Sequence, residues 1–152
     1  MNEESLDKFL NLLYENQNAI RTYEIQQEIK KKRAEHNERG LQGGSANVQL
    51  IEIVVEGMVR FVADFMGELA NNAQFVSDNH ISKFWASVIE KLNQNLPSTV
   101  KGWSSVISSK GQDKQAVEAG LSKAIEELEK VYIRIANLEE EKRFFLSSLK
   151  NE

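Results

Sequence analysis

The sequence predicts an all-α protein, an up-and-down bundle of four to five helices with long N- and C-terminal helices. Three observations support this prediction. Near the C-terminus, apolar residues recur at a 4,3,4,3 spacing from Val117 to Leu149. The segment 46–72 is apolar except for a polar residue at every third or fourth position. The 152 residues include one proline, and scarcity of proline suits long uninterrupted helices.

The first helix is expected over 5–39, with Ser5 as its N-cap. Its segment 30–39 is polar apart from Ala34, so we expect the last turns to project into solvent. Gly40 is expected to end this helix, and the glycine-rich segment around it predicts a flexible hinge at 40–46.

The second helix is expected over 46–72, and most of its residues are apolar. Such a helix exposes one narrow polar stripe to water and must be covered on most of its circumference. Within the stripe, Glu56 and Arg60 stand four residues apart, a favourable pairing on a helix. The polar positions are Gln49, Glu52, Glu56, Arg60, Asp64 and Glu68. Five of them are charged, which argues against a membrane span.

A third helix is expected over 78–96, capped by Ser77 or Asp78 and stopped by Pro97. A short fourth helix would follow, and then a loop at 108–113 with Asp113 as the N-cap of the last helix.

The last helix is expected to be coiled-coil-like, because the 4,3,4,3 spacing keeps one seam facing a partner helix. Lys142 is the one polar member of the seam, and flanking apolar residues broaden it into a bundle face. The seam is Val117, Leu121, Ala124, Leu128, Val131, Ile135, Leu138, Lys142, Phe145 and Leu149. We expect one domain, 1–152, and a homodimer that buries the second or the last helix.

Composition narrows the functional classes. The net charge of −4 gives no general attraction to nucleic acid or anionic lipid. The absence of cysteine excludes thiolate chemistry and disulfides. The first residues are acidic and lack an apolar core, which predicts a cytoplasmic location, although a specialised export route would escape this test.

No catalytic, cofactor-binding or metal-binding residues are predicted. His36 and His80 lie far apart, neither belongs to a Glu-x-x-His motif, and both are expected in ordinary helix-end positions. Acid–base or metal chemistry would need burial of the carboxylates of the second helix, Glu52, Glu56, Asp64 and Glu68. A solvated or interhelically paired stripe is the simpler interpretation.

A basic run offers an alternative function. The run creates a local positive potential, although successive residues wrap around a helix and form no single stripe. Contact with a nucleic-acid backbone would use Lys30, Lys31, Lys32, Arg33 and Arg39.

Large aromatic residues mark candidate partner-binding positions. Phe84 and Trp85 are adjacent, as are Phe144 and Phe145, so we expect one of each pair in the core and the other near the surface. The proposed docking residues are Trp103, Phe144 and Phe145.

The segment from Leu96 to Trp103, followed by that from Gln115 to Leu121, resembles a stretch of type III secretion filament and needle-tip proteins. These proteins also pair long terminal helices around a central insertion. The resemblance implies a subunit of a secreted bacterial filament or needle-tip assembly.

The leading hypothesis is a non-enzymatic helical-bundle module for protein–protein interaction, an adaptor, accessory subunit or small regulator that forms an oligomer. The alternatives are a nucleic-acid-associated accessory subunit, a secreted assembly subunit, and an enzyme or metal carrier that uses the carboxylates of the second helix.

Overall fold

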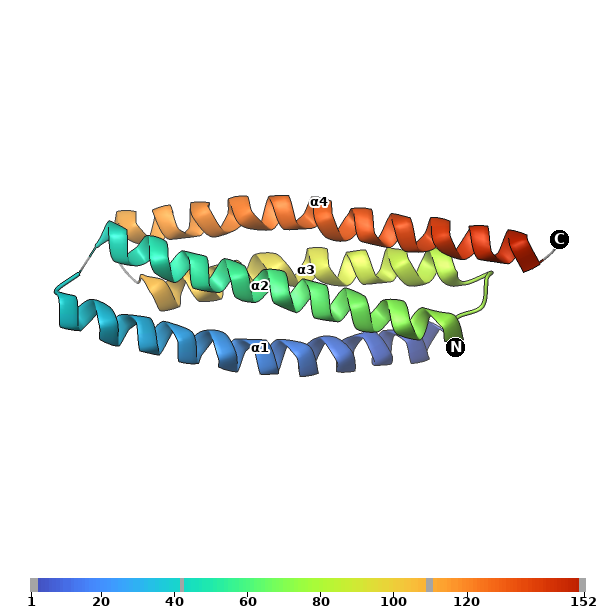
Figure 1. The fold of residues 1–152 in the computed structure, drawn as a ribbon, viewed down its shortest axis with the longest axis horizontal. Helices are drawn as coiled ribbons and strands as arrows, with labels where there is room; N and C mark the ends of the chain where they lie inside the picture. Colours follow the sequence, from blue (N-terminus) through green and yellow to red (C-terminus); the bar gives the residue numbers. More distant parts are fainter. Residues whose placement is uncertain (1–2, 42, 109–110, 151–152) are drawn as a thin grey trace.

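The computed structural model describes residues 3–41, 43–108 and 111–150. Within these residues the chain forms four long helices and one turn of 3₁₀ helix, and it contains no β-strand. Consecutive helices run in opposite directions, as Figure 1 shows, which confirms the predicted all-α bundle. The elements are α1 (Glu3–Arg39), α2 (Gly44–Asn72), η1 (Ala73–Phe75), α3 (Ile81–Ile107) and α4 (Gly111–Lys150).

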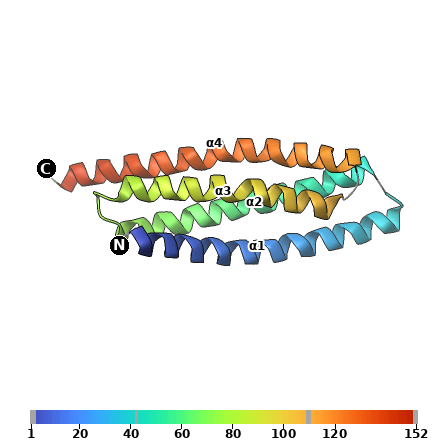
Figure 2. The same ribbon diagram turned by 180° about the vertical axis from the view of Figure 1, so that it is seen from behind.

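The helices do not form a regular square. α3 packs along α4, and α1 packs along α2, whereas α1 and α3 touch sparsely. α2 starts beside the N-terminal end of α4 and then diverges from it towards α1, as the two opposite views in Figure 1 and Figure 2 agree. The C-terminal half of α4 therefore lacks the neighbour that its N-terminal half has.

The core is centred on α2 and α3, where the large side chains are fully buried. The ring of Tyr14 from α1 meets Phe61 and Phe65 from α2 edge-on, with centroids 5.0 and 5.5 Å apart. Edge-to-face arrangements of this kind add stability beyond the burial of the rings. α2 buries the side that carries Leu50, Val54 and Phe61, but Val48 and Val59 are about half exposed, so the uncovered part of its surface is wider than the predicted polar stripe.

The end of α1 confirms two predictions and corrects the position of His36. Gly40 adopts a φ of 67°, and the Leu41 amide donates to the His36 carbonyl at 2.8 Å, which closes the helix with a Schellman motif. The last turns of α1 are largely exposed, as predicted, but they bond to the rest of the bundle at two points. His36 is 4 % exposed, with its Nε2 2.8 Å from Oε1 of Gln49 in α2. The Arg33 guanidinium donates to the carbonyl of Ile107 at the end of α3. His36 stays buried because its ring bonds to the side chain of Gln49 on the neighbouring helix.

α3 continues through Pro97, so the prediction of two separate helices is wrong. A proline inside a helix costs roughly 3 kcal/mol. The buried side chains of Leu92, Leu96 and Val100 hold both halves of the helix against the core. Burying three such side chains is worth roughly 5–9 kcal/mol, which exceeds the cost of the proline.

The helix starts also differ from prediction. His80, rather than Ser77 or Asp78, is the N-cap of α3, and Asp78 binds α4 instead. Asp113 lies inside the first turn of α4, which begins at Gly111. Gly44–Ala46, expected as part of the hinge 40–46, belong to the first turn of α2, and residue 42 lies outside the described residues.

Gly57 provides a test of the contact between α1 and α2. A Cβ at this position would lie 2.4 Å from Cγ1 and Cδ1 of Ile25, which is itself buried. We expect Gly57→Ala to lower the free energy of unfolding by about 1–3 kcal/mol because α1 must shift to make room. The control is Gly67→Ala on the same helix, where nothing lies within 4 Å.

Removing a glycine from a helix interior without a clash raises stability by about 0.5–1 kcal/mol. Urea denaturation of both variants therefore gives shifts of opposite sign. Two stabilising substitutions would show that α1 does not approach α2 closely at Gly57.

Candidate protein-interaction face

The predicted seam of α4 is correct only in its first half. Val117, Leu121 and Leu128 are buried, but the line of burial then continues to Tyr132 and Ala136 instead of Val131 and Leu138. A straight α-helix drifts by about 20° per heptad from a 3.5-residue repeat, so a long seam rotates away from a straight neighbour. The divergence of α2 removes the helix that the second half of the seam would otherwise face.

Tyr132, one of these buried residues, bonds α4 to α3. Its ring is 1 % exposed, and its hydroxyl donates to Oδ1 of Asn93. Burial, with a smaller effect from the charge of Glu129, raises the pKa of the Tyr132 phenol to about 12. This residue therefore stays neutral and fixes the rotation of α4 about its own axis.

The second half of the seam is exposed to solvent. We call the residues Val131, Leu138, Lys142, Phe145 and Leu149 the α4 stripe. Val131 is 50 % exposed and Leu138 is 53 % exposed, while Ile135 beside them is half-buried. Six of the thirteen exposed large apolar side chains of the described residues lie between positions 131 and 149, so this segment of α4 carries the largest concentration of uncovered apolar side chains. The six are Val131, Leu138, Phe144, Phe145, Leu146 and Leu149.

The adjacent aromatic pairs do not divide between core and surface as predicted. Phe84 and Trp85 are both buried, because α3 lies against other helices on two sides. Phe144 and Phe145 are both exposed, because this part of α4 reaches and then passes the end of the bundle (Figure 1).

Trp103 lies apart from the other two predicted docking residues. It is 6 % exposed and belongs to the core. Its edge lines a shallow cavity of about 270 Å³ between α1 and α3, together with Thr22 and Val106. We therefore leave Trp103 out of the candidate face.

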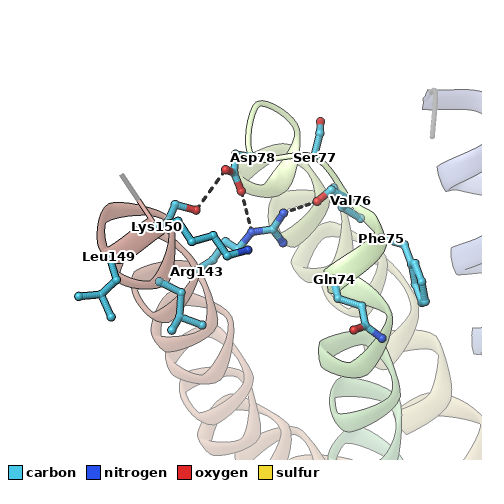
Figure 3. A pocket seen from close by; sticks show the side chains of 10 residues that line it. Gln74, Phe75, Val76, Ser77, Asp78, Arg143, Leu149 and Lys150 are labelled. Atoms are coloured by element: carbon cyan, nitrogen blue, oxygen red, sulfur yellow. Dashed lines mark hydrogen bonds and ion pairs between the residues drawn. The ribbon is translucent and has the colours of Figure 1, made fainter. Parts of the chain in front are cut away.

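A salt-bridged cavity of about 750 Å³ borders the α4 stripe at the end of the bundle. Figure 3 shows Arg143 of α4 reaching across it to the connection between α2 and α3. Its guanidinium donates to the carbonyl of Ala73 at 2.9 Å and to Oδ1 of Asp78 at 2.7 Å, and it also bonds the carbonyl of Val76. Leu146 and Leu149 of α4 and Phe75 of η1 supply apolar lining.

The Asp78 carboxylate is held in its charged form. The Arg143 guanidinium, and then the Ser147 hydroxyl, keep the pKa of Asp78 below its ordinary value. Arg143 anchors this part of α4 and is not among the site residues predicted from the sequence. The position of this charged residue next to the apolar run Phe144 to Leu146 was the one feature of the sequence that could have indicated an anchoring role.

The carboxylates of α2 take part in interhelical bonds. Asp64 is paired with Arg21 of α1, and Oε2 of Glu68 accepts a bond from Gln17 at 2.7 Å. Arg60 bonds to Glu28 of α1 at 3.2 Å, and not to Glu56 as the spacing suggested. Glu52 and Glu56 lie exposed on the remaining stripe. In 3–41, 43–108 and 111–150, no group of three His, Cys, Asp or Glu residues could hold a metal ion.

The basic run is partly used inside the chain. Nζ of Lys32 lies 3.0 Å from the Glu35 carboxylate, and Arg33 bonds the last carbonyls of α3. Lys30, Lys31 and Arg39 are exposed. The run thus offers three cations to a ligand without breaking these internal bonds.

The comparisons with known proteins leave the family open. No family model matches the chain, and neither the curated proteins nor the solved structures contain a significant match. None of the helices in the described part of the chain is long and apolar enough to cross a membrane.

The Asp78–Arg143 pair predicts a pH dependence of stability. Because the folded pKa of Asp78 lies below that of the unfolded chain, the pair stabilises the fold above about pH 4. This contribution is lost as the pH falls through the folded pKa. We expect Asp78→Asn to be less stable than the parent at pH 7, with the difference vanishing in acid, as urea denaturation over a pH series would measure.

Arg143→Gln supplies the control background. Repeating Asp78→Asn in that background removes the main partner, so the pH-dependent difference should shrink to the smaller part that Ser147 supplies. An undiminished difference in the Arg143→Gln background would show that the pair is not its source.

Proposed function

We propose that this chain is a non-enzymatic protein-interaction module, an adaptor, accessory subunit or small regulator, that binds a helix along the α4 stripe. The observation that supports this proposal is the concentration of exposed large apolar side chains between positions 131 and 149. Exposed apolar patches of soluble proteins commonly mark interaction sites.

The stripe has the properties of a helix-docking surface. Val131, Leu138, Phe145 and Leu149 stand seven, seven and four residues apart, which keeps them on one heptad seam that can receive the side chains of a facing helix. Each is about half exposed, so covering all four would yield about 4 kcal/mol before the costs of association. Lys142 can cover apolar surface with its stem and keep its ammonium in water.

The surface is rigid before a partner arrives. Tyr132 fixes one side of α4 to α3, and Arg143 fixes the next turns to the connection between α2 and α3. A preformed surface loses little conformational entropy on binding, which favours recognition by a preorganised helix face.

The polar residues support binding over catalysis. Asp64, Glu68 and Arg60 are occupied in bonds between α1 and α2. Nucleic-acid binding through the basic run has weaker support, because Lys32 and Arg33 have partners inside the chain.

An assembly subunit is the second candidate. The extension of α4 past the end of the bundle favours it, because a projecting helix can contact a neighbouring subunit (Figure 2). Such a subunit would use the same α4 stripe.

Site-specific photo-cross-linking tests the proposed face. A photoreactive amino acid replaces Leu138 or Phe145 in the native host, and in control chains it replaces Ser122 or Glu126. All four positions are exposed on α4, but only the first two belong to the α4 stripe. We expect cross-linked protein adducts at 138 and 145 and none at 122 and 126. Adducts at the control positions alone, or at none of the four, would refute the proposal.

A further inference from the structure

The cavity of about 750 Å³ at the end of the bundle takes no part in the proposed function. Its lining shares only Leu149 with the α4 stripe. The volume lies within the range of roughly 300–1,000 Å³ that is usual for small-molecule sites. Such sites combine apolar walls with a few convergent polar groups, and this cavity has both.

The Arg143 guanidinium crosses the cavity with donors to spare. A guanidinium carries five N–H groups. Asp78 and the carbonyls of Ala73 and Val76 accept bonds from three of them, which leaves two without an acceptor among the residues that the structure describes. Because the Arg143 side chain is 22 % exposed and lines the cavity, a ligand there can accept bonds from the unused donors.

The lining carries a net positive charge. Its charged side chains are those of Arg143, Lys150 and Asp78. Arg143 neutralises Asp78, whose second carboxylate oxygen accepts a bond from Ser147 at 3.1 Å. Lys150 has no ion-pair partner within the described segments 3–41, 43–108 and 111–150. One positive charge is therefore left over, and it favours a ligand with a single negative charge.

Apolar side chains border these charged groups. Leu146 follows Arg143 by three residues and precedes Lys150 by four, so the three side chains share one face of α4. Figure 3 shows Leu149 and Phe75 on opposite sides of the Arg143 guanidinium. All three apolar side chains are exposed. A ligand whose anionic group meets Arg143 and Lys150 can cover them with an apolar remainder and remove their surface from water.

We infer that this cavity binds an amphipathic monoanion, an acyl carboxylate whose head lies between Arg143 and Lys150 and whose chain lies along Leu146 and Leu149. A carboxylate accepts charge-assisted hydrogen bonds from a guanidinium, and these are stronger than neutral ones. Its single charge matches the one unpaired cation, whereas a phosphate monoester carries about two negative charges. The inference goes beyond the proposed function, because it concerns a small ligand at a separate site.

Three probes of equal chain length test the ligand class on the intact chain by isothermal titration calorimetry. They are octanoate, uncharged octanol and cationic octyltrimethylammonium. We expect octanoate to bind saturably at one site per chain. Octanol should bind at least about tenfold more weakly because it forms no charge-assisted hydrogen bonds, and octyltrimethylammonium should not bind.

Two matched pairs of variants locate the site. Lys150→Gln should raise the dissociation constant of octanoate about threefold, whereas Lys123→Gln, elsewhere on α4, should leave it unchanged. Leu146→Asn should also raise it at least about threefold. Its control is Leu138→Asn on the α4 stripe, outside the cavity lining. All four side chains are exposed, so the variants should fold, and circular dichroism checks this.

The contrary outcomes are distinct. Equal affinity for octanoate and octanol, unchanged binding by Lys150→Gln, or no saturable binding of octanoate would each overturn the inference. An equal loss in Leu138→Asn and Leu146→Asn would overturn the cavity as the site, because the ligand would then lie on the α4 stripe. None of these results alters protein cross-linking at Leu138, so the proposed function stands or fails separately.

Discussion

The attachment of the C-terminal half of α2 to α1 is the constraint on which the rest of the structure depends. Arg60 and Asp64, one turn apart on α2, bond Glu28 and Arg21 of α1. Gly57 just before them lets Ile25 approach the backbone of α2 closely. These contacts hold α2 against α1, so that it diverges from α4. The exposed α4 stripe is the consequence.

Where α2 has diverged, α4 packs against α3 and the connection before it. Tyr132 bonds Asn93 of α3, and Arg143 bonds the connection between α2 and α3. Both residues lie to one side of the heptad seam, which therefore turns outwards after Leu128. A single chain cannot cover its own seam, and covering it with another helix is the simplest way to remove that apolar surface from water.

The sequence predicts the fold class and the first half of the α4 seam because hydrophobic periodicity determines both. It does not predict where the seam is left uncovered, because that depends on the path of α2. The pairing of Asp64 with Arg21 involves residues 43 positions apart, which periodicity along one helix does not reveal. The predictions for His36 and Pro97 were wrong for a related reason. Contacts with α2 bury His36 although its segment is polar, and contacts with the core keep α3 helical through Pro97.

The rotation of the contact line along α4 can be measured directly by cysteine accessibility. The chain has no cysteine, so single cysteines at successive positions from 117 to 149 can be labelled with a maleimide in dilute solution. The account predicts slow labelling at 117, 121, 128, 132 and 136 and fast labelling at 131, 138 and 145. Slow labelling that keeps the 4,3,4,3 rhythm through 131, 138 and 145 in dilute monomer would contradict it.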